Sequence, residues 1–140
     1  MVKRLLGAAL LAGGLGTACG GIDLVGNSTL AAGTYVATVF LVTPPGEQQV
    51  NVLGAGGSLS IAISTSGSTS GSLNIPASVS GGPLTASMAG TATVTELTVE
   101  FDQDADTFVR DLNWARVGTA IQVGNVSAGG ALFTITLQRQ

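Results

Sequence analysis

The chain has 140 residues, of which only 9% are charged and 4% are aromatic, and it contains one cysteine and no histidine. Without histidine it cannot build the common zinc sites or a histidine-based catalytic triad. After residue 18 the charges are three arginines and eight acids, a net charge of −5, which gives nucleic acid no basic surface to bind. We therefore expect no enzymatic activity, no cofactor and no nucleic-acid partner.

Residues 1–18 have the three parts of a secretory signal. Lys3 and Arg4 make a positive head, an apolar run of about eleven residues follows at 5–15, and small residues complete the segment. The apolar run is too short to span a bilayer as a helix. We expect the chain to be exported and residues 1–18 to be removed.

The residues around the single cysteine resemble a known motif. The stretch LGTAC at 15–19 resembles the lipobox of bacterial lipoproteins, although Gly16 stands where that family usually has leucine. The resemblance implies that Cys19 receives a diacylglycerol and anchors the protein in a membrane. The glycine that follows it implies sorting to the outer membrane of the cell envelope. The alternative is an ordinary secretory signal, cut at Ala18 or Ala12, that leaves a stray cysteine.

Beyond the signal, the composition changes twice. Residues 19–32 are rich in Gly, Ser and Ala without clear periodicity, so we expect a flexible tether before one domain at 33–140. From residue 33, short apolar runs recur about every ten residues with turn signals between them, which is typical of antiparallel β-structure. We expect strands at 35–42, 49–53, 58–64, 71–75, 85–94, 96–101, 108–117, 119–123 and 131–138.

This spacing predicts an all-β fold, a single small antiparallel up-and-down β-barrel of about eight strands. A barrel of that size has an interior that is filled by side chains or holds one small ligand. Most of the runs are shorter than the roughly nine to eleven residues of a transmembrane β-strand, and the aromatics are too few for two interfacial girdles. We therefore do not expect the barrel to span a membrane.

Both ends of the expected barrel carry residues with a second resemblance. Gly33-Thr34-Tyr35 opens the first strand, and Arg139 follows the last. This is similar to the lipocalin and calycin pattern, in which Gly-x-Trp opens the barrel and an arginine packs across the tryptophan ring. The resemblance implies a cation–π contact between Arg139 and Tyr35 at the barrel base. The alternative is a core tyrosine and a solvated terminal arginine.

The segment FDQDADTFVRDLNW at 101–114 carries half of the chain's carboxylates. Asp102, Asp104 and Asp106 have the spacing that opens an EF-hand loop, but the glycine and glutamate required further on are missing. We expect strand, acidic turn and strand, with a looser calcium site at the barrel rim as the alternative. If Phe108 faces inward in the second strand, Arg110 does too.

These observations favour a lipid-anchored, non-enzymatic barrel at the cell envelope. We expect it to bind a small apolar ligand or an envelope component at its mouth, with Arg110 and Trp114 as candidate ligand or rim residues. The alternative function is a structural or protein-interaction module, such as an inhibitor-like barrel with a filled core.

Overall fold

The computed structural model describes residues 29–140, so the expected signal at 1–18, Cys19 and most of the expected tether lie outside the described residues. Within 29–140, no helix is long and apolar enough to cross a membrane. The elements are β1 (Gly33–Thr43), β2 (Val50–Asn51), β3 (Ser58–Ile63), β4 (Ser68–Ile75), α2 (Ala77–Ser80), β5 (Leu84–Ser87), β6 (Gly90–Val94), β7 (Thr98–Gln103), the 3₁₀ helix η1 (Phe108–Asp111), β8 (Trp114–Val117), β9 (Ala120–Ala128) and β10 (Ala131–Arg139).

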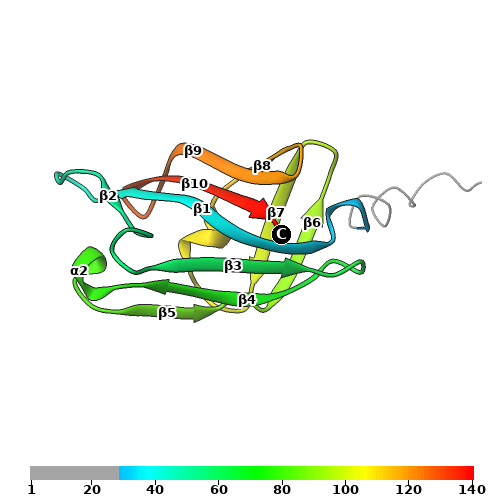
Figure 1. Cartoon of the computed structure of the whole chain (residues 1–140), viewed down its shortest axis with the longest axis horizontal. Helices are drawn as coiled ribbons and strands as arrows, with labels where there is room; N and C mark the ends of the chain where they lie inside the picture. The colour runs from blue at the N-terminus through cyan, green and yellow to red at the C-terminus, as the bar shows by residue number, and fades with distance from the viewer. Residues whose placement is uncertain (1–28) are drawn as a thin grey trace, which may run out of the picture.

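Eight of the strands close into an antiparallel barrel (Figure 1). The order around the barrel is β1, β3, β4, β6, β7, β8, β9 and β10, and β10 pairs back with β1. Each strand in this ring therefore lies beside the next along the chain, with β2 added to β1 and β5 added to β4. The predicted all-β, up-and-down barrel of about eight strands is confirmed.

Alternation of apolar and polar residues explains which side of each strand faces the core. In β3, Leu59, Ile61 and Ile63 are buried, while the residues between them are half-buried or exposed. In β10, Phe133, Ile135 and Leu137 are buried in the same way. Burying one such side chain stabilises the fold by about 1.5–3 kcal/mol. The barrel interior is therefore a packed hydrophobic core.

The first and last strands form the longest ladder of the barrel. The register runs from Tyr35 opposite Arg139 to Thr43 opposite Leu132, with a bulge between Ala37 and Val39. This pairing removes the two sheet edges that an open sheet would expose.

The barrel has two different ends (Figure 1). We call one the terminal end; there residues 29–33, the turns at 64–68, 95–98 and 117–119, and residues 139–140 come together. We call the other the mouth; it is surrounded by the end of β1, the start of β10, the loop at 44–49 and α2. The chain therefore enters and leaves the described domain at the terminal end.

The packed domain begins earlier than the expected boundary at residue 33. Thr29, Leu30 and Ala31 are helical, and Ala31 is fully buried. The Tyr35 hydroxyl donates a hydrogen bond of 2.7 Å to the Ala31 carbonyl. These last residues of the expected tether are thus part of the fold.

The long strand expected at 85–94 is broken into β5 and β6. Met88 lies between them and is fully buried, and its carbonyl accepts a hydrogen bond of 2.8 Å from the Thr69 hydroxyl.

The short helix α2 was also not expected. It begins after Pro76 and ends at Gly81, which is left-handed with φ +81°, as is common at helix ends.

The strand expected at 108–117 is wrong in its first half. Residues Phe108–Asp111 form η1, and only Trp114–Val117 is a strand. The Thr107 side chain caps η1 by accepting from the Val109 amide, which favours a helical start over an extended one. The expectation that Arg110 faces inward with Phe108 is wrong, because the helical turn leaves Arg110 exposed while Phe108 packs against the core.

Gly71 marks a close approach between β4 and β3. Its φ is +130°, and a Cβ at this position would clash with the Ser60 carbonyl oxygen. Gly71→Ala should therefore lower the free energy of unfolding by about 2–4 kcal/mol, from backbone strain and overpacking. Gly82→Ala is the matched control, because nothing lies within 4 Å of the added methyl group. Chemical denaturation would measure both, and equal effects would contradict the close approach.

Candidate functional site

The mouth of the barrel contains an open depression of about 510 Å³. Its lining is mainly apolar, and Glu47 is the charged residue among the lining side chains. The apolar lining residues come from β1, β4, α2, β5, η1 and β10: Val42, Ile75, Val79, Leu84, Phe108 and Phe133. The depression has the size and chemistry of a small-molecule site.

Aromatic rings lie at the inner side of this depression. Phe108 and Phe133 stack with their centroids 4.3 Å apart and an interplanar angle of 15°. Phe40, which is fully buried below them, lies 6.0 Å from Phe108 at a tilt of 51°. Aromatic side chains bury large apolar areas and offer flat surfaces to an apolar ligand.

The position of Phe108 follows from how η1 is held. Val109 is fully buried, and its carbonyl accepts a 3.0 Å hydrogen bond from the indole N–H of Trp114. The Thr107 cap fixes the start of η1 from the other side. Phe108, on the same turn, is directed against Phe133 from β10. The helix therefore directs Phe108 and Val109 toward the core, while Arg110 and Asp111 are exposed.

Two short segments form the rim of the mouth. The helix α2 contributes Val79 and Ser80, and the Ser80 hydroxyl donates a 2.6 Å hydrogen bond to the Gly82 carbonyl. The loop after β1 contributes Pro44 and Glu47. The sequence prediction missed the α2 contribution, although Pro76 before the helix and Gly81 after it are the usual signals for its ends.

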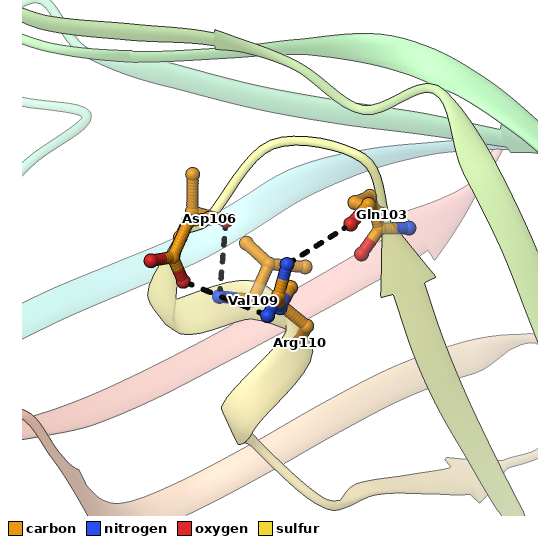
Figure 2. Close-up of polar contacts among 5 residues, drawn as sticks. Gln103, Asp106, Val109 and Arg110 are labelled. Atoms are coloured by element: carbon orange, nitrogen blue, oxygen red, sulfur yellow. Dashed lines mark hydrogen bonds and ion pairs between the residues drawn. The ribbon is translucent and has the colours of Figure 1, made fainter.

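Arg110, predicted as a rim or ligand residue, is not among the residues that line the apolar depression. Its Nη1 donates to the Gln103 carbonyl at 3.4 Å, and its Nη2 lies 3.8 Å from an Asp106 carboxylate oxygen (Figure 2). Asp106 is highly exposed, so this ion pair contributes little stability. Arg110 also borders a second, polar depression of about 480 Å³ with Glu100 and Asp102.

Trp114, the other predicted rim residue, belongs to the core. It is fully buried, and its ring meets Phe101 edge-on with centroids 5.6 Å apart. Its one polar atom is already used in the hydrogen bond to the Val109 carbonyl. Trp114 therefore supports the site by holding η1 and does not line the depression.

The three weak metal candidates are not gathered around a common point. Within residues 29–140, no group of three His, Cys, Asp or Glu side chains is placed to hold a metal ion. The Asp106 carboxylate lies beside the Arg110 guanidinium. The Asp104 amide donates a hydrogen bond to the Ala89 carbonyl, so the residue after β7 contacts the residue before β6. The acidic segment runs from a strand into a loop and a helical turn, not into a second strand.

A buried polar pair joins β4 to β7 across Gly90 of β6. Gln103 Nε2 donates to the Thr69 hydroxyl at 3.3 Å, and both residues are buried. Gln103 Oε1 is buried without a hydrogen-bond partner among the described residues. An unsatisfied buried acceptor of this kind lowers stability. The sequence prediction missed this pair, because Gln103 stands at the end of a strand that is otherwise rich in charge.

The residues expected at the barrel base do lie together, but Arg139 makes other contacts than those the resemblance implied. The Arg139 side chain lies over Gly33, where an added Cβ would come within 2.7 Å of Arg139 Nε. Its Nη1 donates to the Leu30 carbonyl at 3.4 Å. Tyr35 is buried and directly opposite Arg139 in the ladder.

No protein-family description, curated protein or solved structure matches this chain.

The single tyrosine makes the terminal end sensitive to high pH. Burial raises the pKa of Tyr35 above its usual 10.0, and the charges of Arg139 and Arg116 oppose part of this shift. The unfolded state would ionise first, so the stability from this group should be complete below about pH 10 and fall as pH rises through the folded-state pKa. Absorbance of the tyrosinate during a reversible pH titration would measure this. Ionisation in the folded protein at or below pH 10 would contradict it, and Tyr35→Phe should remove the signal.

Proposed function

We propose that this protein is a non-enzymatic, lipid-anchored barrel of the cell envelope that binds a small apolar ligand at its mouth. The observation that carries the proposal is the open, phenylalanine-floored depression of about 510 Å³. Ligand pockets typically have volumes of about 300–1,000 Å³ and a mainly apolar lining with few polar groups. Glu47 at the rim is the group that would meet a polar or positively charged end of such a ligand.

The depth of the site sets the kind of ligand. The interior below Phe108 is filled by buried side chains, among them Phe40 and Trp114. A ligand would therefore rest in the mouth with one side toward solvent, and a long chain could not enter the barrel axis. A compact apolar group with one polar end fits this geometry best.

The same filled interior supports a second candidate function. If the mouth takes an apolar side chain of another envelope protein in place of a free ligand, the barrel is an interaction module of the inhibitor-like kind. Both functions use the same depression, and a small neutral probe distinguishes them.

The first test of the proposal measures binding of N-phenyl-1-naphthylamine, a neutral apolar fluorescent probe, to the full chain. Leu84→Asp should weaken binding at least about tenfold, because it places a charge against the apolar lining. Leu97→Asp is the matched control, since Leu97 is also an exposed leucine but lies at the terminal end. Equal probe binding by both variants, or none by the wild type, would remove the ligand-binding proposal and favour the interaction module.

The anchor is tested separately. The proposal assigns Cys19 to lipidation, on the resemblance of the stretch at 15–19 to a lipobox. Cys19→Ser should release the protein from the membrane fraction, because acyl chains contribute about 0.8 kcal/mol for each buried methylene. Cell fractionation and the intact mass of the extracted protein measure the effect. A soluble wild-type protein whose mass shows no acyl chain would contradict the anchor.

A further inference from the structure

The terminal end of the barrel carries the most exposed large apolar side chains of the described chain. Leu97 is 73% exposed, Leu30 66% and Val117 53%. The two others of this kind, Leu84 and Leu132, are 36% and 37% exposed and lie at the mouth side. Clustered apolar exposure at one end of a small domain marks a surface that meets a partner or a membrane.

Hydrogen bonds show that these three residues lie close to one another at the terminal end. The Arg116 amide donates to the Leu97 carbonyl at 2.7 Å. Because Val117 directly follows Arg116, this bond places Leu97 and Val117 near each other. The Arg139 amide donates to the carbonyl of Thr119 in the next turn, and its guanidinium reaches the Leu30 carbonyl. We call this surface the terminal face: Leu30, Leu97, Arg116, Val117 and Arg139.

The charge of the terminal face is opposite to that of the remaining barrel. Arg116 and Arg139 lie on it with one nearby acid, Glu96. The remaining described residues carry one arginine, Arg110, against six acids: Glu47, Glu100, Asp102, Asp104, Asp106 and Asp111. Among residues 29–140, Arg110 and Asp106 form the one ion pair. Arg116 and Arg139 therefore have no carboxylate of these residues within 4 Å.

We propose that the terminal face rests on the surface of a bilayer that contains anionic lipid. Exposed leucine and valine side chains insert between headgroups, and arginines beside them are attracted to lipid phosphates. The acidic remainder of the barrel is repelled by the same surface, so the charge asymmetry selects one orientation. Guanidinium groups also retain free N–H donors for phosphate oxygens after the hydrogen bonds to Thr95 and Leu30.

The place where the chain enters the domain supports the same orientation. Residue 29 lies at the terminal end, and the ten residues from Cys19 to it span at most about 36 Å. β1 alone has 11 residues and a length of about 36 Å. If Cys19 is acylated as proposed above, the terminal face is the nearest part of the barrel to the bilayer. The exposed side chains and the charges do not depend on that anchor.

The test uses the full chain with Cys19→Ser, so that an introduced thiol is the only one. An environment-sensitive fluorophore is attached at Leu97→Cys or, as the matched control, at Leu132→Cys. Vesicles of phosphatidylcholine with phosphatidylglycerol carry a lipid-attached quencher. The label at 97 should be quenched at least about threefold more than the label at 132, and Arg116→Glu should halve that quenching while Arg110→Glu leaves it unchanged.

Each other outcome overturns the proposal. Equal quenching at both positions would mean that the barrel has no preferred end toward the bilayer. Quenching that is the same with pure phosphatidylcholine would remove the role of the arginines. If vesicles do not quench the label at 97, the terminal face does not bind the bilayer, and a protein partner becomes the better explanation of its exposed side chains. Binding of N-phenyl-1-naphthylamine by the same variants reports on the mouth alone, so failure here is distinguishable from failure of the proposed function.

Discussion

The antiparallel ladder between β1 and β10 is the constraint on which the other features depend. It joins the first and last strands of the described domain and turns a meander of hairpins into a closed barrel. Closure at eight strands fixes an interior just wide enough for side chains to fill. The hydrophobic core and the meeting of the first and last strand ends of the described domain both follow from that ladder.

On one side of the barrel, the strands are not paired along their whole length. β8 has only four residues, so it pairs with the first part of β9 and leaves the later part with β10 alone. β5, across the mouth, pairs with β4. The helix η1 and its Phe108 occupy the space between, and the depression remains above them.

The sequence predicted the fold well where side-chain alternation is strong. β3 and β10 have a clean period of two, and both were expected within about two residues of their bounds. η1 was missed because Phe108, Leu112 and Trp114 satisfy an inward strand row as readily as a capped helical turn. The break at Met88 was missed because it depends on Thr69, nineteen residues earlier, which no local pattern reveals. The mouth likewise depends on residues from six separate elements, so its lining could be predicted only in part.

The same ladder also determines when the domain can fold. β1 is apolar on both faces, and its partner β10 is the last strand of the described domain to be synthesised. Until then β1 lacks one neighbour, and contacts between such distant segments form slowly because a long loop must close first. The barrel therefore closes only after β10 is available to pair with β1.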